Sequence, residues 1–509
     1  MSDGEFVLGI DAGTTSLRAA LFDLRGALLA FADQSYETIY PRPGWAEQHP
    51  EDWWQALVRA VRECVTLSGV DSERIIGLAI DAPCDVLLVD HSGAPLTESL
   101  MWMDLRAAEQ AHRLTQTHDP VLRYCGGETP AEWPLPKALW LKEHMPARWD
   151  QAAYVTEQMS WLTWRLTETW AAPLNSATAK WHYRVETDGA TPAGWPTTLM
   201  KAVDLEDLAE KLPSRVVAMG AQAGTMTIRA AEALGLRPGV AVAMSGIDAH
   251  AGMVGMNVLA PGTLALITGT STCQLAQASQ PAFDPGLWGP FEAAVVPKAW
   301  TLEAGQASTG GTVRWLLETM GGALPSGEAQ YAAADAEAAA VAPGSEGLTV
   351  LDFWQGSRTP VKDPLARGAI LGLTPAHTHG DLLRAVYEGT AYGNRHILDM
   401  LRQLGVPTED IRACGGGTRS ALWLQILSDV ANVPITLMEV SDAVALGTAI
   451  CAAVGAGAFA DLAAAGQAMA RPHATIEPNP AHRAVYDDGY ARYKAAAAAL
   501  MPVFHMAQE

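Results

Sequence analysis

The chain has 509 residues, of which 49% are hydrophobic and 18% charged. This composition is typical of globular proteins, and the length allows two or more large domains. A formal net charge of -22 and a pI of about 5.0 argue against general binding to nucleic acid or to anionic membranes. An anionic nucleotide is still compatible with this charge, because it needs only a local pocket of backbone N–H groups.

The cysteines and the N-terminus indicate a cytoplasmic protein. The six cysteines are scattered, with no CxxC pair and no Cys/His spacing suited to zinc, as expected for reduced thiols. The opening residues MSDGEFVLGIDAG lack the basic-then-apolar pattern of a signal peptide. No apolar run is long enough to span a bilayer, so we expect no membrane partner.

The first turn of the chain has the composition of a phosphate-binding turn. Phe6–Ile10 and Leu17–Asp23 are predicted strands, and they are joined by Asp11-Ala-Gly-Thr-Thr-Ser16. Backbone N–H groups and hydroxyls on such a turn can wrap phosphate oxygens, and the Asp11 carboxylate could then reach a hydrated Mg²⁺. An ordinary hairpin turn explains the stretch equally well. A P-loop is excluded, because no GxxxxGK[ST] occurs.

A second acid of interest follows the predicted strand Gly239–Met244. Asp248 precedes a His-Ala-Gly step that could open a helix. A carboxylate at a strand-to-helix turn lies where parallel α/β sheets bind their ligands. A helix N-terminus favours the ionised form, which can accept a proton. The alternative is a helix N-cap with no catalytic role.

Other charged residues of the N-terminal half have two interpretations. Lys137, Lys180 and the pair Asp104-x-Arg106 matter for a site only if they converge, and a lone lysine is usually solvated. The loop Asp81-Ala-Pro-Cys-Asp85 interrupts two apolar strands. Such a loop is a place for substrate contacts or a plain strand connection.

The second half repeats the opening pattern. Pro261–Ala276 is again strand, Gly/Thr turn and strand, like Leu8–Phe22, which indicates two related lobes facing one nucleotide. Ile411–Gly417 is a predicted strand that ends in three glycines before the predicted helix Ser420–Ala431. Glycines there let a flat ring or a phosphate approach the backbone, although a tight turn uses them too.

Together these stretches resemble the FGGY carbohydrate kinases, in the superfamily of actin and the heat-shock chaperone ATPases. Six ordered motifs carry the resemblance over nearly the whole chain: GIDAGTTSLRAALFD (9–23), WMDLRA (102–107), GIDAHAG (246–252), GTSTC (269–273), GSRTPVKDPLARGAILGLT (356–374) and ACGGGTRSALWLQILSDVANVPI (413–435). It implies an α/β fold of two ribonuclease-H-like, actin-like ATPase lobes with a cleft between them. The expected divisions are 1–254 for the sugar-binding lobe, 255–485 for the ATP-binding lobe, and 486–509 for a C-terminal helix and tail.

The resemblance also implies ATP and Mg²⁺ as cofactors and assigns roles to residues. Asp11 would hold Mg²⁺ and Asp248 would be the general base that takes the proton of a sugar hydroxyl. The residues of the two phosphate turns and of the adenosine site would be Gly13, Thr14 and Thr15; Gly269, Thr270 and Ser271; and Gly415, Gly416 and Gly417. Phosphoryl transfer needs position, charge neutralisation and an in-line hydroxyl more than covalent help, which suits this set.

Four segments resemble the ribulokinase branch and so indicate the sugar substrate. They are the Asp81–Cys84 loop, Lys180-Trp181, His250 and Glu303-Ala-Gly-Gln306. By this likeness the sugar pocket is lined by Ala82, Cys84, Lys180, Asp248 and Glu303. Lysine and carboxylates give each hydroxyl of a ribulose a strong partner. Pro83, Asp85 and Ala304 depart from the D-ribulose pattern, and the first fifty residues look as much like xylulose kinases.

Three alternatives therefore stay open. A xylulose kinase or a sugar-alcohol kinase for a tetritol, pentitol or glycerol keeps the enzyme class. The third alternative is not an enzyme but a non-catalytic switch protein that binds a sugar or a nucleotide. The intact phosphate turns and Asp248 argue against it. A homodimer fits the family, but no residue determines it.

Overall fold

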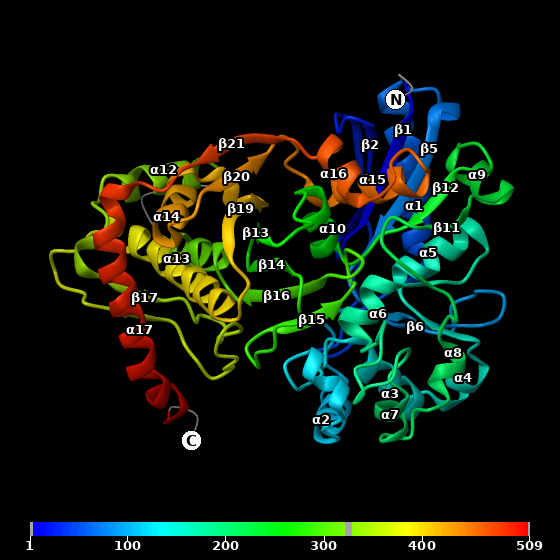
Figure 1. Cartoon of the computed structure of the whole chain (residues 1–509), viewed down its shortest axis with the longest axis horizontal. Coiled ribbons are helices and arrows are strands. Elements are labelled where there is room, and N and C mark those ends of the chain that lie inside the picture. The colour runs from blue at the N-terminus through cyan, green and yellow to red at the C-terminus, as the bar shows by residue number, and fades with distance from the viewer. Residues whose placement is uncertain (1–3, 321–327, 507–509) are drawn as a thin grey trace.

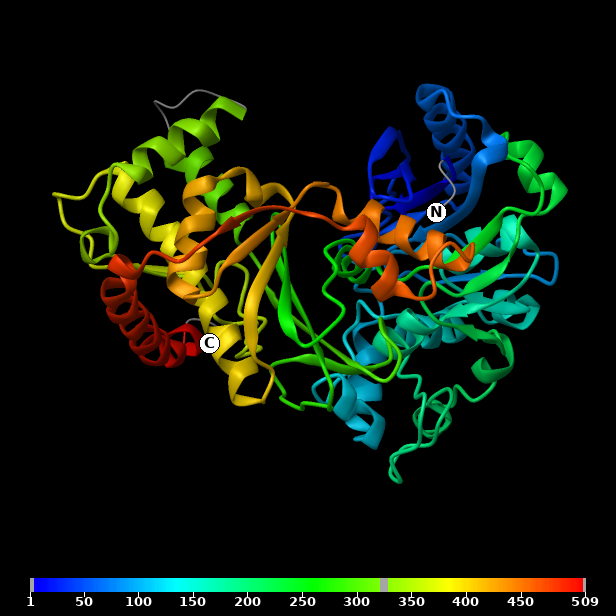
Figure 2. The ribbon, with the colours of Figure 1, turned by 45° about the horizontal axis from the view of Figure 1, so that its top comes forward.

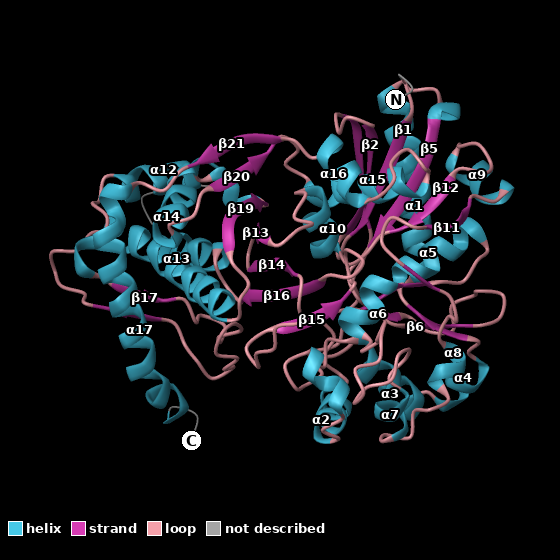
Figure 3. Ribbon diagram, in the orientation of Figure 1, coloured by secondary structure: helices cyan, strands magenta, loops and turns pink. Residues whose placement is uncertain are grey.

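The computed structural model describes residues 4–320 and 328–506. These residues form two α/β lobes, on the right and left of Figure 1, and the expected two-lobe α/β fold is confirmed. Figure 3 shows each lobe as a sheet with helices packed on it. Within the described ranges no helix combines the length and the apolar character needed to cross a membrane.

The first lobe is built on a six-stranded sheet of order β11-β12-β5-β1-β2-β3. Strands β1, β2 and β3 are antiparallel neighbours, whereas β5 runs parallel to β1 and β12 runs parallel to β5. The bounds are β1 Phe6–Ala12, β2 Ser16–Asp23, β3 Leu28–Ser35, β5 Ile75–Asp81, β11 Gln222–Thr225 and β12 Ala241–Met244.

The second lobe repeats this arrangement in a seven-stranded sheet of order β15-β16-β14-β13-β19-β20-β21. Strands β13, β14 and β16 are antiparallel neighbours, and β19 and β20 continue from β13 in parallel. The internal repeat therefore places the β1–β2 and β13–β14 turns at equivalent positions. The bounds are β13 Gly262–Thr268, β14 Thr272–Ala278, β15 Trp288–Glu292, β16 Trp300–Gln306, β19 Thr408–Cys414, β20 Ile435–Met438 and β21 Pro472–Ile476.

Alternating apolar side chains bury both faces of the first sheet. Leu8 and Ile10 face one hydrophobic core, with α1 Pro50–Ser68, α5 Gln158–Thr167 and α9 Ile228–Leu234. Val7 and Ala79 face the other, with α15 Ala443–Gly455 and α16 Leu462–Met469. The outer face of the second sheet carries α11 Gly310–Met320, α12 Glu328–Ala339, α13 His379–Gln403, α14 Ala421–Ala431 and α17 Arg483–Met506.

Two helices rich in small residues lie between the sheets, which Figure 2 shows from a second direction. Helix α10 (Asp248–Gly255) packs on β13 and β14, and α15 packs on β1 and β5. They approach so closely that a Cβ on Gly255 would overlap the Ala443 carbonyl and one on Gly447 would overlap the Ala251 carbonyl. Although α15 follows β20 in sequence, it covers the first sheet.

The division at residues 254 and 485 stays a prediction: α10 ends at Gly255 and α17 begins at Arg483. A helical subdomain is inserted between β5 and β12, and it carries Lys137 and Lys180. Its elements and the remaining short strands are β4 Glu47–Gln48, β6 Leu87–Val89, β7 Ser99–Leu100, α2 Ala108–Gln116, α3 Pro134–His144, α4 Pro146–Gln151, β8 Tyr154–Thr156, β9 Ala172–Pro173, α6 Leu174–Lys180, α7 Thr197–Lys201, α8 Leu208–Lys211, β10 Val216–Val217, β17 Thr349–Leu351 and β18 Ala369–Leu371.

Candidate active site

The first turn, which joins β1 and β2, begins at a buried carboxylate. Asp11 lies near the end of β1, and Arg18 Nη1 donates to its Oδ2 at 3.0 Å. The pKa of Asp11 is raised to about 7, mainly by burial. Asp248 and Asp442 also raise this pKa, whereas Arg18 lowers it. A carboxylate surrounded by other acids and short of cations is suited to receive a metal ion.

Asp81 is a member of this acidic group that the sequence interpretation did not assign. It is directly opposite Asp11 in the parallel register of β1 and β5, and it is fully buried. Thr448 Oγ1 donates to its Oδ2 at 2.5 Å, while its Oδ1 has no partner among the described residues. The signal was present in the sequence, because Ile-Asp-Ala occurs at Asp11, Asp81 and Asp248, each time at the end of a buried strand or just after it.

The first turn is held from outside through its carbonyl and hydroxyl oxygens. Tyr36 Oη donates to the Gly13 carbonyl, and Gln48 Nε2 donates to the Thr14 carbonyl at 2.6 Å. Trp102 Nε1 donates to Thr14 Oγ1 at 3.0 Å. None of these bonds uses a backbone N–H group of the turn, which is the group that a phosphate requires.

The second turn is tied to the start of α11. The Thr270 carbonyl accepts from the N–H groups of Thr309 and Gly311, each at 2.9 Å, and the Gly269 carbonyl accepts from Gly310 N–H at 3.1 Å. Gly269 and Thr270 line a cavity of about 900 Å³, whereas Ser271 is exposed beside it. The turn is therefore fixed at the mouth of a cavity large enough for a nucleotide.

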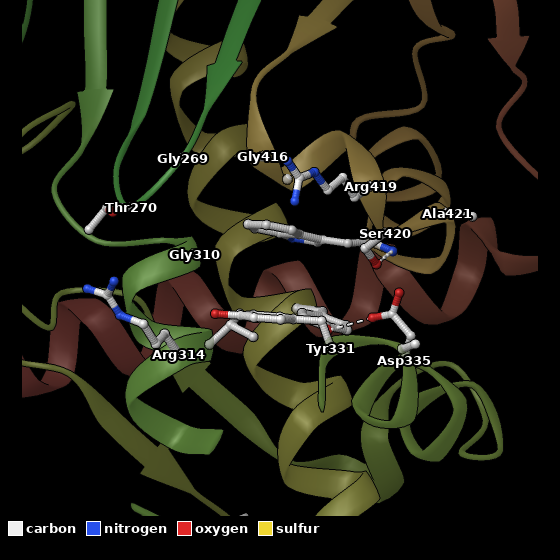
Figure 4. A pocket seen from close by; sticks show the side chains of 15 residues that line it. Gly269, Thr270, Gly310, Arg314, Tyr331, Asp335, Gly416, Arg419, Ser420 and Ala421 are labelled. Carbon is white, nitrogen blue, oxygen red and sulfur yellow. Dashed lines mark hydrogen bonds between the residues drawn. The ribbon is translucent and has the colours of Figure 1, made fainter. Parts of the chain in front are cut away.

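This cavity lies in the second lobe, between α11, α12 and the glycine turn after β19 (Figure 4). Tyr387 and Trp423 stack with ring centroids 5.7 Å apart, and Tyr387 Oη donates to Asp335 Oδ1 at 2.7 Å. Its charged lining residues are Arg314, Asp335 and Arg419. Sequence reasoning missed the α12 residues, because an alanine-rich helix carries no ligand signal.

The glycine triplet has two distinct roles. Gly416 and Gly417 line the cavity. Gly415 has φ 93° and ψ -176°, a conformation that only glycine adopts readily, and a Cβ there would overlap the Thr268 carbonyl. Gly415 is therefore required by the backbone. A Cβ on Gly417 would also overlap the side chains of Thr268 and Trp423, so of the three glycines only Gly416 has open space beside it.

Asp248 is the first residue of α10, and the N-cap position belongs to Ile247. Its Oδ1 accepts from the following Ala249 N–H at 2.7 Å, so the N-cap alternative does not describe it. Burial raises the pKa of Asp248 and Glu303 raises it further, against the lowering effects of the Ala249 N–H bond and of Lys180. This upward shift is opposite to the ionised state expected at a helix N-terminus. A raised pKa makes a carboxylate a stronger base.

Lys180 and Glu303 meet across the lobes. Lys180 Nζ lies 3.1 Å from Glu303 Oε2, and their side chains are only 12% and 18% exposed. Burial opposes the charge of Lys180, but Glu303 raises the Lys180 pKa, and Lys180 lowers the pKa of Glu303 against the effect of burial. The Lys180 ammonium lies 5.0 Å from the ring centroid of Trp133. The solvated interpretation of Lys180 is wrong.

Two cysteines lie beside this pair. Burial raises the pKa of the Cys84 thiol, and Glu157, Lys180 and Asp248 contribute to its electrostatic environment. Burial also raises the pKa of the Cys273 thiol, which the sequence interpretation missed. Glu303 and Asp248 raise this pKa further, and Lys180 lowers it. Ala82 is fully buried. Both thiols therefore lie within the electrostatic influence of Lys180 and Asp248.

Other charged candidates have partners that support the structure. Asp85 accepts from Gln158 N–H at 2.8 Å, and Lys137 Nζ donates to the carbonyls of Met101 and Glu132 at 2.5 and 2.7 Å. Arg106 forms a buried pair with Asp104 at 2.7 Å.

No group of three or more His, Cys, Asp or Glu side chains suited to a metal ion occurs in residues 4–320 and 328–506. Asp11 alone nevertheless fits Mg²⁺, which is usually held by one or two carboxylates together with substrate phosphates and water.

Comparisons with known proteins agree with this geometry. Residues 6–255 match the N-terminal domain and residues 264–456 the C-terminal domain of the FGGY family of carbohydrate kinases. An FGGY carbohydrate kinase domain-containing protein of Homo sapiens is 32% identical, with 96% of each chain covered. A ribulokinase of Geobacillus thermodenitrificans is 32% identical over 96% of this chain and 93% of its own. The crystal structure of xylulose kinase from Rhodospirillum rubrum superposes with a TM-score of 0.87 at 28% identity, covering 98% of this chain and all of that one.

Proposed function

We propose that this chain, which belongs to the FGGY family of carbohydrate kinases and is therefore a phosphotransferase, transfers the γ-phosphate of ATP to a hydroxyl of a pentulose, above all a ribulose. The observation that carries the proposal is that the buried Asp248 lies close enough to the Lys180–Glu303 pair for both partners to shift its pKa. A carboxylate base beside two strong hydroxyl-binding groups is what a polyol acceptor requires.

The nucleotide is assigned to the cavity of the second lobe. Gly416 and Gly417 would lie against the adenosine, and Gly269, Thr270 and Ser271 against the phosphates, with Arg314 and Arg419 as cationic neighbours. The turn Gly13, Thr14 and Thr15 would offer its backbone N–H groups to the phosphate that is transferred. The volume of about 900 Å³ supports this assignment.

Asp11 is assigned to Mg²⁺. Asp248 and Asp442 lie near Asp11, and Arg18 is its cationic partner, so the ionised form of Asp11 is short of compensating positive charge. When bound there, Mg²⁺ would neutralise charge on the phosphate oxygens. Arg18 holds the orientation of Asp11 through its 3.0 Å bond.

Asp248 would accept the proton of the sugar hydroxyl as that hydroxyl attacks the phosphate. Its bond to Ala249 N–H occupies Oδ1, so Oδ2 would be the oxygen that accepts the proton. Its raised pKa improves proton acceptance, and such a base typically contributes roughly 10²- to 10⁴-fold to the rate. Lys180 would donate to sugar oxygens, Glu303 would accept from hydroxyls, and Ala82 and Cys84 would form the adjoining wall.

The choice of ribulose rests on the ribulokinase relative and on the Asp81–Cys84 and Lys180 segments. The xylulose kinase structure favours D-xylulose as the second candidate. The test is ADP release with Mg·ATP across D- and L-ribulose, D- and L-xylulose, ribitol, erythritol and glycerol. Highest kcat/KM on a ribulose supports the proposal, highest kcat/KM on xylulose or a polyol replaces the substrate, and no turnover on any of them contradicts it. A cytoplasmic location and a homodimer stay predictions, and sedimentation measures the second.

A further inference from the structure

A buried amide side chain joins the helix that carries Lys180 to the turn that carries Asp248. Asn175, in α6, is fully buried. Its Oδ1 accepts from Ile247 N–H at 2.8 Å, directly before Asp248. Its Nδ2 lies 2.8 Å from the Ala294 carbonyl of the second lobe and 2.8 Å from His250 Nδ1.

The two backbone partners fix the orientation of this amide. The Ile247 N–H can only donate and the Ala294 carbonyl can only accept, so the oxygen and nitrogen of Asn175 cannot be exchanged. The second hydrogen on Nδ2 therefore points at His250 Nδ1. Because that nitrogen accepts a hydrogen bond, the proton of a neutral His250 must be on Nε2.

The environment of the other ring nitrogen favours the same tautomer. His250 Nε2 lies 4.0 Å from Glu303 Oε2, the same oxygen that contacts Lys180 Nζ at 3.1 Å. An N–H directed at this carboxylate is attracted to it, whereas a lone pair would be repelled. Burial lowers the pKa of His250 to about 4, which keeps the ring neutral near pH 7.

We propose that Asn175 is a positioning residue that locks His250 in the Nε2–H tautomer, and so holds the Glu303 carboxylate toward the sugar while it fixes the turn that precedes Asp248. The chain of contacts runs from Asn175 to His250 to Glu303, and Lys180 meets it from α6. His250 is 1% exposed at its side chain, so it acts through Glu303 and not on the substrate. The role for the sugar rests on the proposed function, but the tautomer does not.

The test is the tautomer of His250 in protein labelled with ¹⁵N-histidine, read from the chemical shifts and ring couplings of Nδ1 and Nε2. Signals that vanish in His250→Gln assign this residue among the 13 histidines. We expect a proton on Nε2 and a bare Nδ1 at neutral pH in the wild type. A proton on Nδ1, or on both nitrogens, would overturn the inference.

Asn175→Asp is the decisive variant. Its carboxylate can still accept from Ile247 N–H but offers no donor to His250, so Nδ1 of His250 should become protonated and KM for the sugar should rise roughly ten- to a hundredfold. Asn394→Asp is the matched control, because Asn394 is equally buried but accepts a hydrogen bond from Gln274 in the second lobe. It should leave the His250 signals unchanged.

Asn175→Ala serves if Asn175→Asp does not fold, and it should yield a mixture of both tautomers. An unchanged His250 spectrum in whichever Asn175 variant folds would refute the role of Asn175. If the wild-type tautomer is as expected and the protein phosphorylates no tested sugar, the proposed function fails while the assignment of His250 holds.

Discussion

Gly415 and Gly416 make a matched pair that tests how the glycine turn is built. Gly415→Ala places a Cβ in a backbone region that costs roughly 1–3 kcal/mol for a non-glycine residue. The same Cβ overlaps the Thr268 carbonyl, and the shift needed to relieve this costs about another 1–3 kcal/mol. We therefore expect Gly415→Ala to lower the free energy of unfolding by roughly 2–5 kcal/mol, whereas a Cβ on Gly416 meets no atom within 4 Å.

The assay is urea denaturation of both variants without nucleotide, followed by KM for ATP. Gly416→Ala should be as stable as the wild type or about 0.5 kcal/mol more stable, because Gly416 begins a 3-10 turn with negative φ. Because Gly416 lines the cavity that we assign to the nucleotide, its methyl group should nevertheless raise KM for ATP. Equal stability of the two variants would refute the reasoning.

Two further predictions concern the charges of the site. In a double-mutant cycle of Lys180→Met and Glu303→Gln, each single change should lower the free energy of unfolding by roughly 1–3 kcal/mol and raise KM for the sugar. The coupling energy between the two changes should be about 1 kcal/mol or more, and a value below about 0.3 kcal/mol would contradict a stabilising ion pair. Because the pKa of Asp11 is about 7 and Mg²⁺ requires the ionised form, affinity for Mg·ATP should fall as the pH drops from 8 to 6, by at most about tenfold per pH unit, with proton release at pH 7. Calorimetry in two buffers measures this, and Asp11→Asn should bind without the proton release; identical proton release in the variant would refute the assignment.

The fold could be predicted from local patterns, because each phosphate turn is a short strand–turn–strand unit that the sequence repeats. The β1–β2 and β13–β14 turns therefore lie where the repeat indicated. The position of α15 could not be read in this way, because its pairing with the first sheet joins residues hundreds of positions apart. Its small residues reflect the close contact with α10, which only the tertiary structure reveals.

The site was partly predictable for the same reason. Asp11 lies near the end of β1 and Asp248 follows β12, so their location at the carboxyl ends of strands followed from the sequence. The meeting of Lys180 with Glu303 depends on how an inserted helix packs against the second lobe, and no local spacing encodes that. Asn175 was missed because a buried asparagine gives no signal until its three partners are known.

The most direct test of the account is the kcat of Asp248→Asn on the best pentulose, measured beside its KM for the sugar and its thermal stability. The amide keeps the size of the side chain but cannot accept the proton, so kcat should fall roughly 10²- to 10⁴-fold with little change in stability. A variant that retains more than about a tenth of the wild-type kcat would contradict the assignment of Asp248 as the general base.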